Sequence, residues 1–365
     1  MKTAKYAAIL AVSLALFFGM AAWGLAMPDE EVSRSERRKL AQRPECSVQA
    51  VVSGAYMEDL EAYLLDQFPL RDGWRTVKAL TRFTLFRQLD NNGIYLVGDH
   101  VLKLEDPLRE AQVTYAADKI NSVIGTYLQG MNVRYAVVPD KNFFAAAANG
   151  YPHMDYDRLT ALMQERVNAP YVDLFPLLRL DDYYRTDPHW RQEALLPVAQ
   201  ALADAMGLGA DLEPEGGFET HTLEPFYGAY CGQSALPVEP DVLTYLTSAA
   251  TDAASMTGIE FQGTQPVYTV DRFAGMDGYD VFAGGAQAIV TLESPGAKTG
   301  RELILFRDSF GSSLAPLFLE GYSKVTLIDL RYVASSLLEQ FVDFADQDVL
   351  FLYSTSLLNS GMLLK

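Results

Sequence analysis

Residues 301–316 read R-E-L-I-L-F-R-D-S-F-G-S-S-L-A-P, and this stretch decides the fold. Residues 303–306 form a short, continuous apolar run, which is typical of a buried parallel strand. Three polar residues interrupt the run, and apolar residues spaced for a helix face follow. A strand, a sharp polar turn and a helix present one side chain, here Ser309, at the carboxyl edge of a parallel sheet. On these residues alone, we favour a simpler interpretation in which Asp308 or Ser309 only caps the helix.

On both sides of this stretch, buried strands alternate with amphipathic helices. We expect strands at 133–138, 170–175, 303–306, 324–328 and 349–353, and helices at 110–130, 155–167, 192–206 and 335–344. This alternation predicts an α/β fold, a three-layer α/β/α domain around a parallel sheet. The pattern stops at 207–300, which is rich in Gly, Pro, Thr and Tyr. Apolar residues alternate there in places, so we expect an inserted β-rich segment.

The part before the first of these strands has a different organisation. Residues 1–27 are expected to form a membrane anchor or signal segment, and the charged residues 28–47 a tether. The domain itself is predicted to span 48–365, beginning at 48–106 with two helices and a hairpin. His100 falls at the tip of that hairpin, where a solvated turn histidine is the expected role.

The amino terminus predicts export. No charged residue occurs between residues 6 and 27, which is long enough to span a bilayer. Lysines precede this run and acidic residues follow it, an asymmetry that places the body outside the cytoplasmic membrane. Gly24-Leu25-Ala26 resembles a cleavage site, so a secreted, processed protein is the alternative. We favour the uncleaved anchor, because the apolar run is longer than a usual signal core.

Charge and cysteine content exclude other classes of protein. The net charge is −18, from 29 basic and 47 acidic residues, so a nucleic-acid partner is not expected. The two cysteines, Cys46 and Cys231, are too few for a disulfide scaffold and lack metal-ligand spacing. They could pair in an oxidising compartment, but we favour free thiols. No metal and no cofactor are predicted.

A second polar turn, residues 183–190, lies between an expected strand and an expected helix. Asp187 and His189 are two residues apart, so the carboxylate can reach one ring nitrogen and leave the other to take a proton from a hydroxyl. Ordinary helix capping around Pro188 explains the same residues. Each of the two turns is ambiguous alone. Together they place a nucleophile and a base at carboxyl strand ends, where open α/β sheets build their sites.

These motifs resemble the DHHW family, which is related to the alginate O-acetylation proteins with permuted SGNH-hydrolase folds. The matching stretches are Thr186-Asp187-Pro188-His189-Trp190, Phe226-Tyr227-Gly228-Ala229-Tyr230, Arg307-Asp308-Ser309-Phe310 and Ile328-Asp329-Leu330-Arg331-Tyr332. Pro188 replaces the first histidine of the family's Asp-His-His-Trp motif, and Arg307 replaces the usual Gly or Lys.

The resemblance implies that Ser309 is the nucleophile, His189 the general base and Asp187 the residue that orients it. Gly228 would supply an oxyanion-hole N–H. Arg331 and Lys141 follow other strands and are candidate substrate-binding residues, although a surface salt bridge explains Arg331 equally well. Trp190, Tyr184 and Tyr227 could stack on sugar rings.

The leading hypothesis is an extracytoplasmic O-acetyltransferase that acts on a cell-surface or secreted polysaccharide. A membrane-bound O-acyltransferase would supply the acetyl group. A carbohydrate acetyl-esterase and a non-catalytic carbohydrate-binding or scaffold protein are the alternatives.

Overall fold

The computed structural model describes residues 2–33, 35–210 and 212–365. The chain divides into two compact units. Unit 1 comprises Met1–Asn92 and Cys231–Pro237, and unit 2 comprises Gly93–Tyr230 and Val238–Lys365. The candidate nucleophile and base both lie in unit 2.

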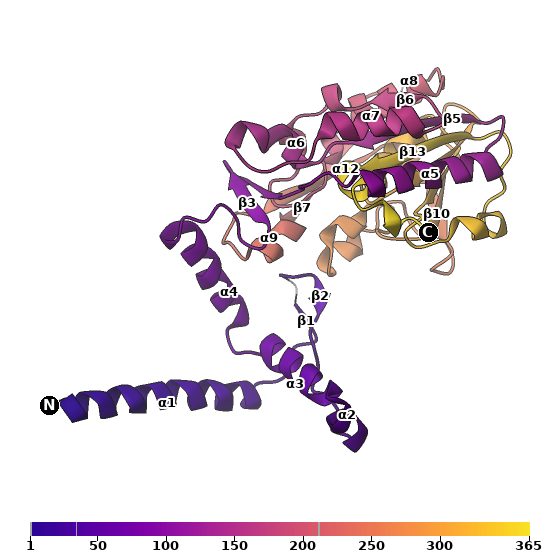
Figure 1. Ribbon diagram of the computed structural model, residues 1–365. Helices are drawn as coiled ribbons and strands as arrows, with labels where there is room; N and C mark the ends of the chain where they lie inside the picture. Colours follow the sequence, from indigo (N-terminus) through magenta and orange to yellow (C-terminus); the bar gives the residue numbers. More distant parts are fainter. Residues whose placement is uncertain (1, 34, 211) are drawn as a thin grey trace. The chain divides into compact units, whose positions relative to one another are not determined.

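A seven-stranded sheet forms the centre of unit 2 (Figure 1). Its strands, in order across the sheet, are β6 (Tyr171–Asp173), β5 (Asn132–Val138), β13 (Asp348–Ser354), β11 (Glu302–Arg307), β12 (Lys324–Ile328), β10 (Ile289–Glu293) and β9 (Ser255–Gly258). The pairs from β6 to β12 are parallel, whereas β10 and β9 are antiparallel to their neighbours. The five strands predicted from the sequence are therefore the parallel ones.

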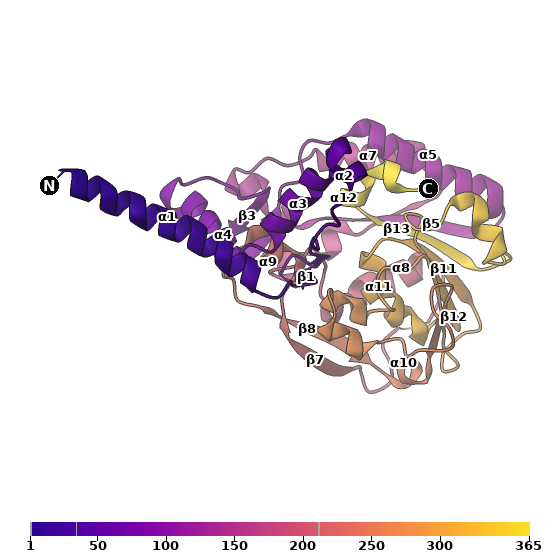
Figure 2. The ribbon, with the colours of Figure 1, turned by 90° about the horizontal axis from the view of Figure 1, so that it is seen from below.

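Alternate residues of β11 pack into two separate hydrophobic cores. Leu303 and Leu305 belong to the core that contains α8 (Leu196–Ala205) and α11 (Phe310–Leu314). Ile304 and Phe306 belong to the core on the opposite face, which contains α5 (Glu110–Tyr127) and α7 (Tyr156–Arg166). Figure 2 shows α5 and α7 on one side of the sheet and α11 on the other. Because both faces are covered, the strands read as continuous apolar runs, and the predicted three-layer fold class is confirmed.

The β-rich segment expected at 207–300 is present, and it also completes the central sheet. It contains an antiparallel pair, β7 (Glu219–Phe226) and β8 (Asp241–Thr247), followed by β9 and β10 of the seven-stranded sheet. The short helices α9 (Ala229–Ser234) and α10 (Ala249–Ala253) and the 3-10 helices Val270–Ala274 and Gly278–Val281 lie between these strands.

Several predicted helices are shorter or tighter than expected. A 3-10 helix, Ser335–Gln340, replaces the helix predicted at 335–344, and Gln192–Ala194 is a 3-10 turn that precedes α8. The remaining short helices of unit 2 are α6 (Lys141–Ala145), α12 (Thr355–Leu358) and the 3-10 helices Ala147–Asn149, Phe175–Leu177, Leu180–Asp182, Ala315–Glu320 and Gly361–Leu363.

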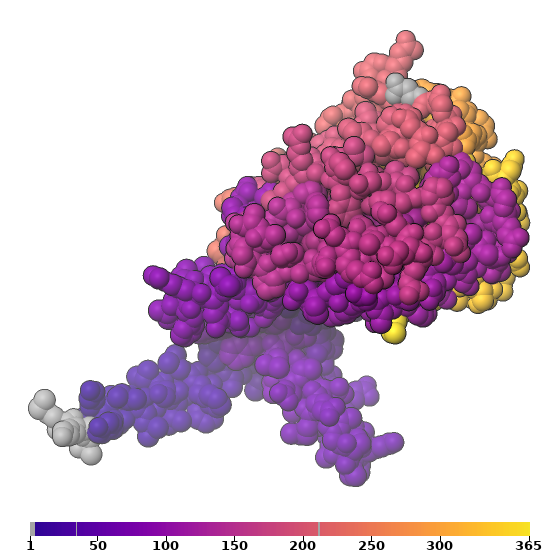
Figure 3. Space-filling view, turned by 45° about the horizontal axis from the view of Figure 1, so that its top comes forward, coloured from indigo at the N-terminus to yellow at the C-terminus, as the bar shows by residue number. Residues whose placement is uncertain are grey.

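The face of unit 2 seen in Figure 3 is coloured mainly purple to magenta, the colours of the chain from α5 to α8.

A hairpin, β3 (Ile94–Val97) and β4 (His100–Lys103), begins unit 2. The solvated role expected for His100 is wrong, because only 7% of this residue is exposed. Burial, together with the nearby Lys141 ammonium, lowers the pKa of His100 below its usual value. His100 is the first residue of β4, so it is buried with the strand and not exposed in the turn.

Unit 1 is helical. It contains α1 (Lys2–Ala26), α2 (Val48–Ser53), α3 (Ala55–Asp66), α4 (Arg71–Leu80) and a π-helical turn (Thr81–Leu85), with a short pair β1 (Val32–Ser33) and β2 (Arg38–Lys39). Among the described residues, α1 is the one helix long and apolar enough to cross a membrane. It therefore fits either a signal peptide or a single anchor. Cys46 and Cys231 are not joined to each other by a disulfide.

Candidate active site

Ser309 occupies the turn between β11 and α11. Its side chain makes no capping hydrogen bond to the helix. Asp308 performs that function instead, since its carboxylate accepts hydrogen bonds from the N–H of Phe310 at 3.1 Å and of Ser354 at 2.8 Å. The hydroxyl of Ser309 is left to make another contact: its Oγ lies 2.7 Å from Nε2 of His189. The capping interpretation thus applies to Asp308 and not to Ser309.

Asp187 orients the ring of His189. Its Oδ1 lies 2.6 Å from the ring Nδ1 and accepts the backbone N–H of His189 at 3.1 Å. Its Oδ2 accepts the N–H of Ala229 at 2.8 Å, and the carboxylate is fully buried. A carboxylate held against Nδ1–H leaves Nε2 free to accept the hydroxyl proton of Ser309. The three predicted residues therefore lie in one hydrogen-bonded chain, although His189 and Ser309 are 120 positions apart in the sequence.

Lys141 holds the loop that carries Asp187. Its ammonium lies almost fully buried and donates to the carbonyls of Val101, Tyr184 and Arg185 at 2.7–2.9 Å. These contacts connect α6, the hairpin and the loop at one point. A buried cation whose protons are shared among backbone carbonyls positions the chain, so these contacts give Lys141 a structural role in holding the loop.

Gly228 also supports the loop. Its N–H donates to Thr186 Oγ1 at 2.9 Å, and a Cβ at this position would lie 2.2 Å from the carbonyl oxygen of Thr186. Only glycine fits such a close backbone approach. The N–H of Gly228 is therefore committed to the Asp187 loop and is not directed to an oxyanion at Ser309.

Comparison with known proteins agrees with these motifs. A family model, DHHW protein, matches residues 163–328, a range that includes Asp187, His189 and Ser309. The resemblance to the DHHW family is confirmed. None of the curated proteins matches the chain.

Solved structures share the fold. A DHHW family protein from Eubacterium siraeum is 21% identical, with a TM-score of 0.59, and the match covers 75% of this chain and 95% of that one. Bacillus cereus PatB1 is 16% identical, with a TM-score of 0.59 and coverage of 74% and 99%. PatB1 with a sulfonyl adduct is 15% identical, with a TM-score of 0.57 and coverage of 74% and 98%.

The tryptophan of the DHHW motif is a structural residue here. Trp190 is fully buried, and its Nε1–H donates to the carbonyl of Phe310 at 3.1 Å and to Ser313 Oγ at 3.0 Å. It thereby ties the histidine loop to the helix that follows Ser309. Tyr184 is also fully buried, so neither ring has a face to offer a sugar. Tyr227, with 55% exposed, has a ring that is accessible for stacking.

Tyr279 is a site residue that sequence reasoning missed. Its ring stacks on the imidazole of His189, with centroids 3.9 Å apart and planes 7° apart, and its hydroxyl donates to Ser313 Oγ at 2.7 Å. Phe310 contacts the same imidazole, with a centroid distance of 4.9 Å. Tyr279 lies in the 207–300 segment, where no strand or motif marks it, so no sequence signal could have identified it.

Two arginines, one at the end of β11 and one shortly after β12, share the buried carboxylate of Asp329. Arg331 donates three side-chain hydrogen bonds to Asp329, from Nε to Oδ1 at 2.9 Å and to Oδ2 at 3.2 Å, and from NH2 to Oδ2 at 2.6 Å. Arg307 is fully buried, with NH1 3.8 Å from the same carboxylate. Burial lowers the pKa of Arg307. For Arg331 burial acts in the same direction, but the hydrogen-bonded Asp329 outweighs it and raises the pKa. The salt bridge expected as the alternative for Arg331 is thus the one found.

The residues that the structure describes contain no group of three or more His, Cys, Asp or Glu side chains placed to hold a metal ion. The polar groups that converge at the site are the hydroxyl, imidazole and carboxylate described above. This arrangement can perform nucleophilic catalysis through a serine.

Proposed function

We propose that the protein is an extracytoplasmic O-acetyltransferase that moves an acetyl group through Ser309 onto hydroxyls of a cell-surface or secreted polysaccharide. The observation that carries the proposal is the continuous contact from Ser309 to His189 to Asp187. Helix capping gives residues so distant in sequence no reason to meet, whereas nucleophilic catalysis requires this contact.

In the first step, Ser309 Oγ attacks the carbonyl carbon of an acetyl oxygen-ester donor. His189 Nε2 takes the hydroxyl proton as the Oγ–C bond forms. The bond from the carbonyl carbon to the donor oxygen then breaks, and His189 returns the proton to that oxygen. The result is an acetyl-serine and a donor alcohol. The buried carboxylate of Asp187 stabilises the imidazolium that exists between these proton transfers.

In the second step, a sugar hydroxyl takes the place of the donor. Its oxygen attacks the acetyl carbon while His189 Nε2 accepts its proton. The bond to Ser309 Oγ breaks, and the serine oxygen recovers a proton from His189. Water in place of the sugar would make the protein an esterase. We propose that binding of the sugar acceptor near Tyr227 favours acetyl transfer over hydrolysis. Its exposed ring can stack on a sugar.

We further propose that α1 is retained as an anchor and that a membrane-bound O-acyltransferase supplies the acetyl group. An exported transferase needs a donor on its own side of the membrane, and an anchored one stays close to a membrane-embedded supplier. The charge asymmetry around α1 supports the orientation.

Two measurements test the proposed chemistry. A sulfonyl fluoride should attach to Ser309, as its class of adduct is known for Bacillus cereus PatB1, and Ser309→Ala should abolish labelling. An activated acetyl ester, with and without an oligosaccharide acceptor, then separates the candidate functions by mass spectrometry of the products. Acetylated sugar supports transfer, and acetate formed regardless of acceptor identifies an esterase. If the protein binds sugar but forms no acetyl-serine, the remaining hypothesis is a non-catalytic carbohydrate-binding protein.

A further inference from the structure

The helices of unit 1 expose an unusual amount of apolar surface. We define the apolar face of α3–α4 by Leu64, Phe68, Leu70, Trp74 and Val77. Each of these residues is 44–61% exposed. Trp74 and Val77 are three residues apart and so lie on one side of α4, and Leu70 directly precedes the helix, whereas Ala79 of the same helix is fully buried. Large exposed apolar areas on a protein surface mark interaction sites, including sites of contact with a membrane.

The segment that follows α1 is hydrogen-bonded to the end of α3. Asp29, three residues after α1, accepts a hydrogen bond from the Tyr63 hydroxyl at 2.8 Å. Gln67 exchanges two hydrogen bonds with the backbone of Glu30, both at 2.9 Å. Where α1 leaves a bilayer, these contacts therefore hold the end of α3 at the membrane surface.

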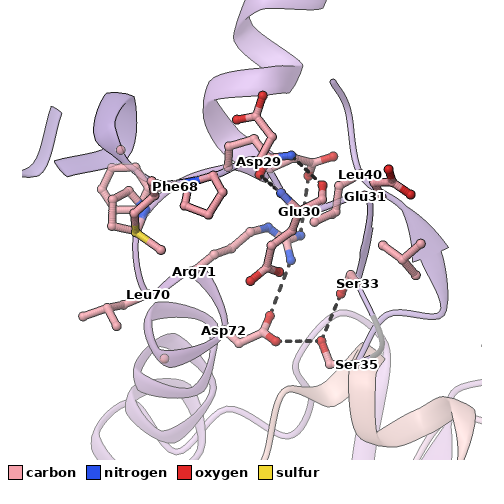
Figure 4. Close-up of a pocket in the computed structure, with 18 residues that line it drawn as sticks. Asp29, Glu30, Glu31, Ser33, Ser35, Leu40, Phe68, Leu70, Arg71 and Asp72 are labelled. Carbon is pink, nitrogen blue, oxygen red and sulfur yellow. Dashed lines mark hydrogen bonds and ion pairs between the residues drawn. The ribbon is translucent and has the colours of Figure 1, made fainter. Parts of the chain in front are cut away.

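The residues after α1 are held in the same way. Arg38 donates to Asp66 at 2.7 Å, and Arg75 NH2 lies 3.2 Å from Glu36. A cavity of about 740 Å³ lies among these segments. Figure 4 shows Arg71 directed into it and Leu70 directed away from it. The polar side of α4 thus faces the segment that follows α1, and its apolar side faces outward.

A second, apolar cleft of about 610 Å³ opens between α1 and α3. Phe17, Met20 and Leu25 line it from α1, and Tyr63, Leu64 and Phe68 line it from the end of α3 and the turn beyond. Residues of α1, the helix long enough to cross a membrane, form one wall of the cleft. Where α1 enters a bilayer, the opposite wall, from the end of α3, therefore also borders the apolar layer. Two members of the apolar face, Leu64 and Phe68, are part of that wall.

The charges of α4 and of the residues after it indicate what the apolar face of α3–α4 would contact. Between residues 71 and 87 the chain carries five basic residues and one acidic residue, although its net charge is −18. Arg71 and Arg75 are paired with Glu36, while Lys78 and Arg87 are exposed. An amphipathic helix with an apolar face and exposed cations beside it is suited to the interface of a bilayer that contains anionic lipids.

We propose that the apolar face of α3–α4 inserts into the outer interfacial layer of the bilayer that α1 enters, and that a lipid acyl chain fills the cleft between α1 and α3. Lys78 and Arg87 then meet anionic headgroups. The proposal rests on the retention of α1 proposed above. It goes beyond simple anchoring, because it holds α3 and α4 at the membrane surface instead of leaving them on a free linker.

Tryptophan fluorescence of the full chain in vesicles tests this placement, because the protein has three tryptophans. Trp23→Phe leaves Trp74 and the buried Trp190, and Trp23→Phe with Trp74→Phe leaves Trp190 as the matched control. Both variants are reconstituted in phosphatidylcholine–phosphatidylglycerol vesicles with acyl chains brominated near the glycerol. We expect bromine to quench the larger part of the Trp74 emission and to spare the control.

Equal quenching of the two variants overturns the proposal. So does Trp74 emission that resists both brominated lipid and an aqueous quencher and changes with the protein-to-lipid ratio, since a second copy would then cover the face. The intact mass of protein extracted from membranes checks retention of α1 separately. Loss of α1 would overturn the membrane placement while leaving labelling of Ser309 by a sulfonyl fluoride unchanged, so the two proposals fail independently.

Discussion

The two turns that form the candidate site are supported in different ways. The Ser309 turn is supported mainly by its neighbours in sequence: β11 leads into it, α11 leads out of it, and Asp308 caps the helix, with one distant bond from the N–H of Ser354 to Asp308. The loop of Asp187 and His189 depends on distant groups, namely Lys141, Gly228 and Asp241, which accepts the N–H of Thr186 at 2.8 Å. The difference teaches that a nucleophile can be placed by a short strand–turn–helix unit, whereas its base here requires the assembled domain.

Replacing the nucleophile should have the largest effect on activity. Ser309→Ala should lower acetyl-ester turnover by roughly three or more orders of magnitude, as loss of a triad nucleophile does. The melting temperature should remain close to that of the parent protein, because the Ser309 side chain makes no capping bond. Unchanged turnover in this variant would remove the enzyme hypothesis.

Asp187→Asn should have the next largest effect, about two to four orders of magnitude in kcat. The amide keeps the shape of the carboxylate but cannot stabilise the imidazolium, and it favours the wrong tautomer of His189. Measuring kcat and KM separately checks this explanation, since substrate binding should change little. A loss confined to KM would argue against the proposed role of Asp187.

Gly228→Ala tests the support of the loop that carries Asp187, whose Cβ would lie 2.5 Å from the added Cβ. The added Cβ would meet the Thr186 carbonyl at 2.2 Å, so the loop must shift. A displacement of this kind costs about 100-fold in rate. Gly125→Ala in α5 is the control, because open space surrounds that position and alanine favours a helix. Equal activity of the two variants would show that the loop tolerates the shift.

Lys141→Met should affect stability more than chemistry. It removes the donor to the buried carbonyls of Val101 and Tyr184, at about 1–3 kcal/mol for an unsatisfied group, while the carbonyl of Arg185 still accepts the N–H of Val101. Denaturant unfolding measures the loss, and the exposed Lys103→Met is the matched control. If Lys141 instead contacted substrate, the variant would keep its stability and raise KM.

The smallest effect concerns His100 and the hairpin that Lys141 holds. Because the pKa of His100 is lowered in the folded protein, its contribution to stability is fully present above its unfolded pKa of about 6.5. That contribution is lost as the pH falls through the lowered folded value, since the unfolded chain takes up the proton first. His100→Gln should therefore show a shallower loss of unfolding free energy with acidification than the parent protein. Parallel curves would contradict this expectation.

The sequence alone determined the layered fold and the local geometry around Ser309. Continuous apolar runs such as 303–306 report burial on both faces of a sheet, and this signal depends only on neighbouring residues. The spacing of Asp187 and His189 likewise indicated which ring nitrogen the carboxylate would reach. The resemblance to the DHHW family added the pairing of this loop with Ser309.

Only the tertiary structure decided which polar residues serve the loop. Lys141, Gly228 and Trp190 were expected to meet substrate, but each is buried against backbone or neighbouring side chains. The ring of Tyr279 reaches His189 from a segment without a pattern. The reason is physical: burial and hydrogen-bond partners depend on groups brought together from distant parts of the chain, and local spacing carries no information about them.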